Sequence, residues 1–378
     1  MNIVIISSFF FPVIQPRSFR ATELSKEFAR RGHRVSVITM NTVDDFDYDS
    51  YEKEHGIEIC RETIIRQDGT AVAAANSRKM RRVEKWARAA VGYLFCGRMI
   101  QYAHLMYKAL LRQNCLDEAD MVIALSTPFC IHWALSKYVK KKGKYFVTIA
   151  DSGDPFYYSK QWKLAPWFKY IERNVYKQMD YLTIPTANAI PSYDTLIPKE
   201  KIRVIPQGFD MSHLNLYQGG FGETVHIAYA GVFYWGIRNP EFLFDYLDKC
   251  SKDYVFHLYL RYRDAVLDQT INKYPNLRSR LRVEYNVPHD KLLYELSKMH
   301  FLVNIENLSN TQMPSKLIDY GMAGRPILSC NETNFSSAVM EQFLSGDYSQ
   351  RYSINLDDYN IVHVADQFLA LKEYNGRN

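Results

Sequence analysis

The sequence predicts an α/β protein made of two doubly wound domains. A chain of 378 residues is longer than a typical single domain. Short apolar strands alternate with helical segments in both halves, which is typical of parallel sheets covered by helices. A polar, glycine-bearing segment, Met211–Thr224, separates the halves. We therefore place one domain at 1–212 and another at 220–360, and expect them to face each other across a cleft. We expect a C-terminal helix at 361–378 to pack back on the first domain.

The first domain opens with a strand, a helix and a second strand. Ile3–Ile14 is apolar enough for a signal peptide, but it lacks a basic start and a small-residue cleavage site. We therefore expect a strand at Asn2–Ser8. Glu23–Arg31 has helical spacing and ends before a glycine, and Val35–Thr39 reads as the next strand.

The loop after the first strand is a candidate binding segment. Ligands of such units bind beyond the carboxyl ends of the strands, so we expect Phe9–Arg20 to face the cleft. It holds no G-x-G-x-x-G motif, which argues against a dinucleotide dehydrogenase. It offers Arg17 and Arg20 instead, as acceptor-binding candidates. The alternative for Arg17 is a solvated loop charge.

An acidic turn follows a later strand of the first domain. After the strands Met121–Leu125 and Tyr145–Ile149 comes a turn that contains Asp151 and Asp154. Carboxylates at this end of a central strand belong in the cleft, where one could orient or deprotonate an acceptor hydroxyl. The alternative is structural: Asp154 caps the following helix and Asp151 holds the turn.

The second domain opens with a strand, Val225–Gly231, that ends in glycine. Without a Cβ, Gly231 lets the backbone approach a ligand closely. Seven residues later stands Arg238, whose guanidinium suits two phosphates through bidentate hydrogen bonds. Arg261 ends the strand Val255–Leu260, which we expect beside the first, and is a further candidate.

A short helix after the buried strand His300–Ile305 is the strongest candidate site. It opens with Pro314, Ser315 and Lys316, and Asp319 lies one turn further on the same face. The helix N-terminus and Lys316 could hold a diphosphate, and Asp319 could accept from ribose hydroxyls. The alternative is a surface Lys–Asp pair on an ordinary crossover helix.

Several motifs together resemble GT-B glycosyltransferases of family 4. Pro314–Pro326 is similar to the family's nucleotide-sugar motif, and Val204–Asp210 closely resembles its hinge phrase. The first strand–helix–strand unit and the acidic turn are also similar. The resemblance implies that Asp319 binds the donor ribose. Thr311 and Val232 replace a glutamate and an arginine of the family pattern, and Glu306 is a nearby substitute for the former.

The resemblance implies a retaining transfer of a sugar from a nucleotide-diphosphate sugar to a glycan or polyprenyl-linked acceptor. The setting it implies is bacterial surface polysaccharide synthesis (capsule, O-antigen or exopolysaccharide), without metal or cofactor. The catalytic candidates are Asp151, Arg238 and Lys316. The donor-binding candidates are Gly231, Arg238, Arg261, Pro314, Ser315, Lys316 and Asp319. The acceptor-binding candidates are Arg17, Arg20, Asp151 and Asp154.

Three other classes stay open. A nucleotide-sugar epimerase or a phosphorylase could use the same fold, although no pyridoxal-binding lysine is identifiable. A non-catalytic subunit of a transferase complex would tolerate the replaced charges. The six cysteines show no C-x-x-C spacing, so we expect neither a disulfide framework nor a metal site. We interpret the histidines as structural or surface residues.

Positive charge is concentrated in one segment. Residues 78–112 contain nine basic residues and one acid, so this window carries +8 and the rest of the chain −2 of the total +6. Aromatic and aliphatic residues interleave with the charges, which predicts docking on an anionic membrane surface. The location expected is cytoplasmic, on the inner face of the membrane. The alternative is a core helix with a solvated basic face; no nucleic-acid partner is expected.

Overall fold

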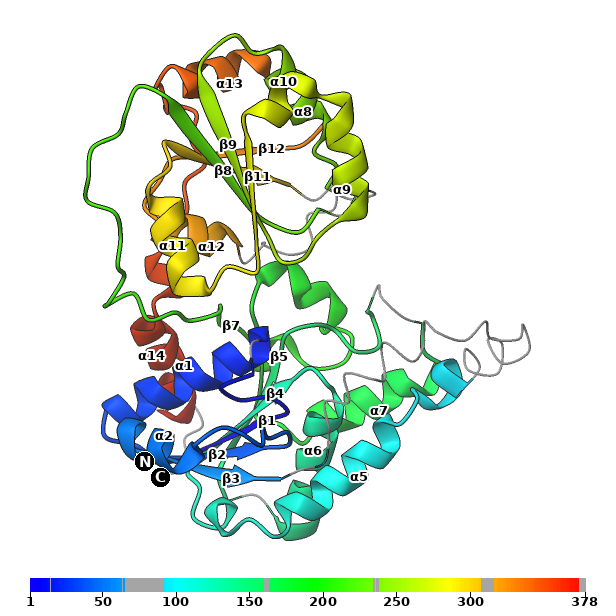
Figure 1. Cartoon of the computed structure of the whole chain (residues 1–378). Coiled ribbons are helices and arrows are strands. Elements are labelled where there is room, and N and C mark those ends of the chain that lie inside the picture. Colours follow the sequence, from blue (N-terminus) through cyan, green and yellow to red (C-terminus); the bar gives the residue numbers. More distant parts are fainter. Residues whose placement is uncertain are drawn as a thin grey trace. The chain divides into compact units, whose positions relative to one another are not determined.

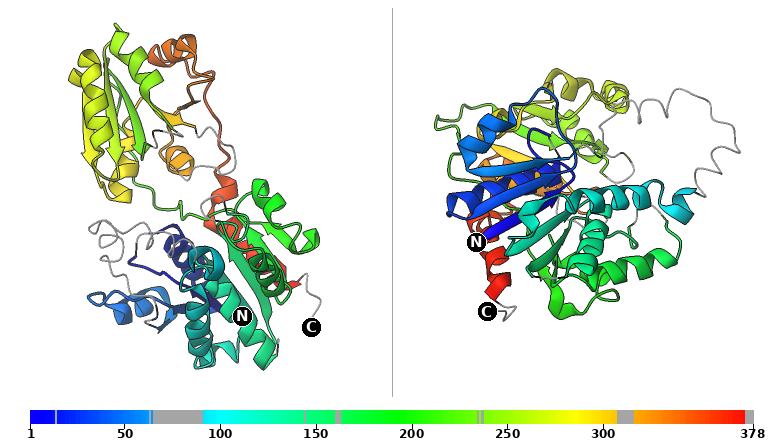
Figure 2. Two further views of the ribbon diagram at one scale, coloured as in Figure 1. Left: turned by 90° about the vertical axis from the view of Figure 1, so that its right-hand side faces the viewer. Right: turned by 90° about the horizontal axis from the view of Figure 1, so that it is seen from below.

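The computed structural model divides the chain into two compact units (Figures 1 and 2). Unit 1 comprises Met1–Asp210 and Asp358–Asn378, and unit 2 comprises Met211–Asp357. The chain therefore leaves unit 1 once and returns to it. The structure describes residues 1–13, 15–62, 64, 91–143, 145–159, 163–233, 235, 238–306 and 316–373.

Unit 1 contains a seven-stranded parallel sheet in the order β3-β2-β1-β4-β5-β6-β7. The strands are apolar and buried because helices cover both faces of the sheet. Their bounds are β1 (Asn2–Ser7), β2 (Arg34–Thr39), β3 (Ile57–Arg61), β4 (Met121–Ser126), β5 (Val147–Ser152), β6 (Tyr181–Ile184) and β7 (Ile202–Val204).

The helices of unit 1 form one layer on each face of this sheet. One core cluster joins the sheet to α1 (Pro16–Arg30), α2 (Tyr48–His55) and α14 (Ile361–Glu373). A second cluster joins the opposite face to α5 (Met99–Leu110), α6 (Cys130–Lys142) and α7 (Trp167–Tyr176). Three 3-10 turns complete the described part of unit 1: η1 (Asn114–Leu116), η2 (Ala187–Ser192) and η3 (Lys199–Lys201). A further turn, η5 (Asp357–Tyr359), begins at the last residue of unit 2 and ends in unit 1.

Unit 2 repeats this architecture with a five-stranded parallel sheet in the order β10-β9-β8-β11-β12. Its strands are β8 (Val225–Gly231), β9 (Tyr254–Leu260), β10 (Leu281–Tyr285), β11 (Phe301–Ile305) and β12 (Ile327–Cys330). One face packs on α8 (Glu241–Lys249), α9 (Ala265–Thr270), η4 (Ile271–Lys273), α10 (Pro275–Ser279) and α13 (Ser337–Leu344). The other face packs on α11 (His289–Ser297) and α12 (Lys316–Met322).

The first helix begins earlier than the sequence pattern predicts. The predicted start at Glu23 is wrong, because α1 begins at Pro16. Proline is favoured in the first turn, since its fixed φ is already helical and its missing N–H would have no helical partner there. As a consequence, Arg17 and Arg20 lie on a helix and not in a loop. Similarly, β5 continues to Ser152, so Asp151 is a strand residue.

The two chain crossings between the units are joined by backbone hydrogen bonds within unit 1. The amide of Phe209 donates to the carbonyl of Tyr359 (2.8 Å), and the amide of Ile361 donates to the carbonyl of Phe209 (3.0 Å). A Cβ on Gly208 would come within 2.6 Å of Ile361 Cδ1. Glycine at 208 therefore permits the first residue of α14 to pack against the departing chain.

Candidate functional site

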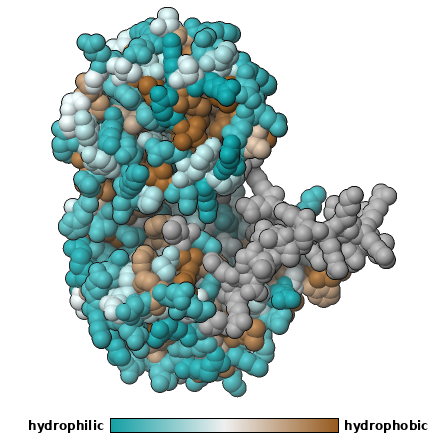
Figure 3. Space-filling view, viewed as in Figure 1, coloured by the Kyte–Doolittle hydropathy of each residue, from teal (hydrophilic) through white to brown (hydrophobic). Residues whose placement is uncertain are grey.

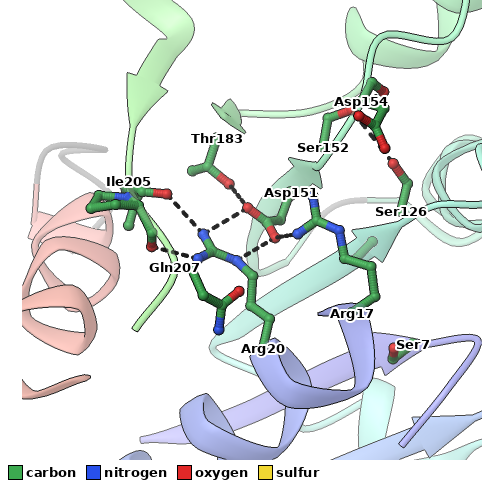
Figure 4. Close-up of polar contacts among 12 residues, drawn as sticks. Ser7, Arg17, Arg20, Ser126, Asp151, Ser152, Asp154, Thr183, Ile205 and Gln207 are labelled. Atoms are coloured by element: carbon green, nitrogen blue, oxygen red, sulfur yellow. Dashed lines mark hydrogen bonds and ion pairs between the residues drawn. The ribbon is translucent and has the colours of Figure 1, made fainter. Parts of the chain in front are cut away.

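A buried ion-pair cluster lies at the carboxyl end of β5 in unit 1 (Figure 4). Arg20 makes a bidentate contact with Asp151: Nε to Oδ2 is 2.6 Å and Nη2 to Oδ1 is 2.9 Å. Arg17 Nη1 donates to Oδ2 at 3.0 Å, and Thr183 Oγ1 donates to Oδ1 at 2.7 Å. Burial would raise the pKa of Asp151, but the charges of Arg20 and Arg17 outweigh it and hold this pKa below its usual range.

This geometry bears on the predicted roles of Asp151. The residue is fully buried, and each of its oxygens accepts two hydrogen bonds. A carboxylate engaged in this way is a weak general base, so the cluster favours a positioning role over deprotonation of an acceptor. The alternative that Asp151 holds a turn is wrong, because the residue lies in β5 and bonds to α1 and β6.

Arg20 also binds the chain segment that leads out of unit 1. Its Nη1 donates to the carbonyl of Pro206 (2.5 Å) and its Nη2 to that of Ile205 (3.0 Å). Both carbonyls belong to the hinge phrase identified in the sequence. Arg20 is almost fully buried, so its guanidinium acts as an internal connector between α1, β5 and this segment.

Arg17 lies beside Arg20 but keeps part of its side chain exposed (15%). Burial lowers the pKa of Arg17, and Asp151 partly offsets this effect. The guanidinium lies against Gly153, where an added Cβ would overlap Nη2. Asp154 accepts a hydrogen bond from Ser152 Oγ through its backbone carbonyl (3.1 Å). Its predicted helix-capping alternative is wrong, because the N-cap of the next described helix, α7, is Pro166.

A second group of charges gathers at the carboxyl ends of β8 and β11 in unit 2. Lys316, the first residue of α12, is 8% exposed, and its Nζ donates to the carbonyl of Ile305 (3.3 Å). The same Nζ lies 4.4 Å from the ring centroid of Tyr229. Burial lowers the pKa of Lys316 well below its usual value, and the charge of Arg238 lowers it further. The alternative of a surface Lys–Asp pair is therefore wrong.

The candidate residues on β8 and β9 are close neighbours. Gly231 has φ +138°, a conformation that side chains rarely adopt, and a Cβ built on it would lie 3.9 Å from Lys316 Cδ, so the two residues are neighbours. Gly231 pairs with Leu260, so Arg261, which is exposed, follows directly beside it. Arg238 is half-buried, with Nη1 3.4 Å from the carbonyl of Val232.

Asp319 has a partner that the sequence did not suggest. Its Oδ1 lies 3.0 Å from Nε2 of His289, the first residue of α11. From the sequence His289 is predicted to be a structural or surface residue, since no spacing relates it to Asp319. The predicted topology is the signal that could have indicated this contact, because helices that cover the same face of a parallel sheet can pack together. The phenol of Tyr320 lies between β8 and β11 and bonds the amide of Ala230 (2.7 Å).

Glu306 is engaged by the loop after β12. It accepts hydrogen bonds from Ser329 Oγ (2.8 Å), Asn331 Nδ2 (3.0 Å) and Asn334 Nδ2 (3.2 Å). Those contacts make it an anchor for this loop and disfavour a substitute role in sugar binding. The remaining predicted residues of this region, Pro314 and Ser315, and the replaced position Thr311 lie outside the described residues.

Other potential sites are few in the part of the chain that the structure describes. No group of three His, Cys, Asp or Glu side chains there is arranged to hold a metal ion. A 420 Å³ surface cavity in unit 1 lies between α7 and the segment 194–201, and no predicted site residue lines it. No helix within the same residues is long and apolar enough to cross a bilayer.

The described part of the basic segment, 91–112, has one buried and one exposed side. Helix α5 packs against α6 and buries Ala103, Met106, Ala109 and Leu110, as the core-helix alternative expected. An exposed group, here called the apolar edge, comprises Val91, Tyr93, Leu94, Phe95 and Ile100. Figure 3 shows hydrophobic side chains gathered at this end of α5. The segment has three basic residues and no acidic one.

Comparisons with known proteins agree with this architecture. The model of the family described as Glycosyltransferase Family 4 matches residues 19–213. This match spans just over half of the chain. The chain therefore belongs to this family and is a glycosyltransferase of the GT-B type, as the sequence motifs predicted. A search of curated proteins found no match.

Solved structures with this fold cover nearly the whole chain. HepE of Anabaena, in complex with UDP and glucose, has a TM-score of 0.60 and 10% identity, covering 99% of this chain and 100% of its own. A glycosyltransferase of Rickettsia africae has a TM-score of 0.65 and 11% identity, with 100% and 98% covered. The lipopolysaccharide outer core galactosyltransferase WaaB has a TM-score of 0.54 and 12% identity, and the match covers 99% of this chain and 98% of the WaaB chain. At these identities the likeness is one of fold, and the predicted α/β, GT-B class is confirmed.

Proposed function

We propose that this glycosyltransferase moves a sugar from a nucleoside diphosphate sugar to a glycan or polyprenyl-linked acceptor, with retention of configuration and without a metal ion. The observation that carries the proposal is the cationic group of Lys316 and Arg238 beside Gly231 in unit 2. The departing nucleoside diphosphate develops negative charge, which such cations stabilise.

The buried state of Lys316 supports this role. An ammonium group that is 8% exposed, with another cation nearby and an aromatic ring below, is destabilised until an anion arrives. A diphosphate would supply the missing counter-charge. Arg238 would contribute a planar, bidentate partner for phosphate oxygens, with Arg261 next to the end of β8 as a further cation. We assign the ribose to Asp319.

We propose that the acceptor is bound by unit 1. Arg17 is the cation of the buried cluster that stays partly exposed, so it is the residue of this set best placed to contact an acceptor. Asp151 and Arg20 would fix the orientation of the Arg17 guanidinium. Asp154, in the turn that follows β5, is a further acceptor-binding candidate. WaaB, which is named as a lipopolysaccharide outer core galactosyltransferase, supports surface polysaccharide as the setting.

We further propose that unit 1 docks on the cytoplasmic face of an anionic membrane. The apolar edge supplies side chains that could enter the headgroup region, and Arg98 and Lys108 supply positive charge, whereas Arg112 is ion-paired with Glu62 (2.7 Å). The full window 78–112 carries +8, and each basic residue close to an anionic surface contributes about 1 kcal/mol. A lipid-linked acceptor would be reached from such a position.

A binding screen tests the donor assignment. UDP, GDP, ADP and CDP would be titrated calorimetrically into the wild-type protein and into the Arg238→Ala and Lys316→Met variants. We expect one of them to bind, and each variant to bind it at least tenfold more weakly, as for a lost charged hydrogen bond. A protein that binds none of them would fit a non-catalytic subunit and refute the proposal.

Activity assays separate the remaining classes. An epimerase would change the donor sugar without transferring it to an acceptor, whereas a transferase moves the sugar to the acceptor and releases the nucleoside diphosphate. We expect activity to survive EDTA. Loss of activity in EDTA, followed by its recovery when Mg²⁺ or Mn²⁺ is added, would contradict the mechanism based on protein charges.

Liposome co-sedimentation tests the docking proposal. We expect binding to phosphatidylglycerol vesicles but not to phosphatidylcholine vesicles, weakened by salt. Charge reversal of Arg78, Lys79, Arg81 and Arg82 should abolish it, and Phe95→Ser with Ile100→Ser should weaken it. Tyr262→Ser, at an exposed aromatic of unit 2, is the control. Binding that ignores lipid charge and salt would refute the proposal.

A further inference from the structure

The carboxylate of Asp319 is held by a side chain from a different helix. His289 opens α11, and its Nε2 lies 3.0 Å from Oδ1 of Asp319 on α12. The two helices pack against each other on one face of the unit 2 sheet. The contact therefore connects two elements that the chain reaches after different strands.

The direction of this hydrogen bond follows from its chemistry. An ionised carboxylate only accepts, so Nε2 of His289 carries the hydrogen and donates. The other ring nitrogen, Nδ1, lies 3.9 Å from Oδ1 of Asp290, too far for a hydrogen bond. Asp290 is fully exposed, so water screens its charge.

The contact makes the two carboxylate oxygens of Asp319 different from each other. Oδ1 is taken by His289, and within the described residues no hydrogen bond reaches Oδ2. The Asp319 side chain is 22% exposed, so a ligand can reach the second oxygen. A bond to one oxygen also fixes the terminal torsion of the side chain, which is otherwise broad. The second oxygen is thus presented in one direction.

We infer that His289 is a positioning residue that makes Asp319 selective for a ribose hydroxyl. This inference rests on the proposed function, in which Asp319 binds the donor ribose. With Oδ1 occupied, Oδ2 accepts from one hydroxyl of the ribose. The site then distinguishes a ribonucleotide from the analogue that lacks this hydroxyl, because the analogue leaves a partly buried acceptor without a donor.

A purely structural role of His289 predicts something different. If the pair only joined α11 to α12, its loss would weaken every nucleotide to the same extent, through a shift of the helix. If His289 positions Asp319, its loss should instead weaken the binding of ribonucleotides more than the binding of deoxynucleotides. The ratio of the two dissociation constants separates the explanations, whereas a melting temperature does not.

The experiment measures this ratio by calorimetry. The ribonucleoside diphosphate that binds among UDP, GDP, ADP and CDP is compared with its 2′-deoxy and 3′-deoxy analogues. In the wild-type protein we expect one analogue to bind about tenfold or more weakly, as for a hydrogen bond to a charged group. His289→Leu should reduce this ratio to about threefold or less, and His289→Gln, whose amide can still donate, should restore most of it.

Two controls complete the design. His213→Leu changes an exposed histidine of the same unit and should leave the ratio as in the wild type. Asp319→Asn should remove the discrimination. A folded His289→Leu variant that keeps the full wild-type ratio would overturn the inference while the proposed function stands. A wild-type protein that binds no nucleoside diphosphate would overturn both.

Discussion

Arg20 on α1 and Asp151 on β5 form a buried bidentate ion pair, and the same guanidinium holds the carbonyls of Ile205 and Pro206. One side chain thus connects the first helix, a central strand and the segment that leaves unit 1. A buried charge is tolerated only while its partner is present. The cluster is therefore more sensitive to the loss of one member than a surface ion pair is.

Asp151→Asn should destabilise unit 1 strongly. The substitution leaves the guanidinium of Arg20 buried without its counter-charge, which costs about 3–5 kcal/mol. Urea denaturation at neutral pH measures the change in the free energy of unfolding. Arg34→Ala, at an exposed ion pair with Glu118, is the control and should cost less than about 1 kcal/mol.

The same variant gives a pH test. The pKa of Asp151 is lower in the folded protein than its ordinary value of 3.8. Its stabilising contribution is therefore complete above that value and is lost as the pH falls toward the folded-state pKa. The wild-type protein should lose stability over this acid range more steeply than Asp151→Asn. Parallel curves would show that the ion pair contributes nothing.

Gly153→Ala should separate acceptor use from stability. A Cβ at this position overlaps Nη2 of Arg17, whose guanidinium must move, while the Arg20–Asp151 pair stays intact. We expect the acceptor KM to rise or kcat to fall about tenfold or more, with the donor KM unchanged. Steady-state kinetics measure this. Gly220→Ala, where an added Cβ meets nothing, should behave as the wild type.

Binding of a nucleoside diphosphate should be accompanied by proton uptake at Lys316. Burial and Arg238 lower the pKa of this lysine in the free protein, and a bound dianion must raise it. Between the two pKa values the complex holds one proton more, so affinity falls as the pH rises. Calorimetry in two buffers of different ionisation enthalpy measures the protons taken up. Lys316→Met should abolish the uptake; equal uptake in this variant would assign it to another group.

Unit 2 should lose stability in mild acid through a histidine pair. Nδ1 of His226 and Nε2 of His257 lie 2.9 Å apart, and burial, followed by the charge of His226, lowers the pKa of His257 to about 4. Below its ordinary value of 6.5, the unfolded chain binds a proton that the folded protein rejects, so stability falls with the pH down to about 4. His257→Leu should flatten this slope in thermal unfolding, and His104→Leu, at an exposed site, should not.

The sequence predicted the strands better than the contacts between them. Apolar runs such as Val225–Gly231 locate strands, and a parallel sheet places their carboxyl ends on one edge, which is why Arg261 was predicted beside Gly231. The Arg20–Asp151 pair spans 131 residues, and no local pattern encodes such a contact.

Two features could not be read from spacing. Helix α1 starts at Pro16 in a stretch without apolar periodicity, because its first turn is stabilised by proline geometry and by the ion pairs of Arg17 and Arg20. His289 follows a proline after an exposed strand, and its function depends on how α11 packs on α12. Side-chain partners chosen by tertiary packing leave no periodic signal.

Unit 2 is an insertion in the chain of unit 1, and the backbone bridge between Phe209 and Asn360 brings together the two points where the chain leaves unit 1 and returns to it. The chain leaves and re-enters its host at adjacent points, so a short turn joining Asp210 to Asp358 would close unit 1 into a continuous chain. Insertions with adjacent ends are easily exchanged, because the host keeps its own core. The topology therefore allows unit 2 to be replaced by another domain of its kind during evolution or in the laboratory, with unit 1 unchanged.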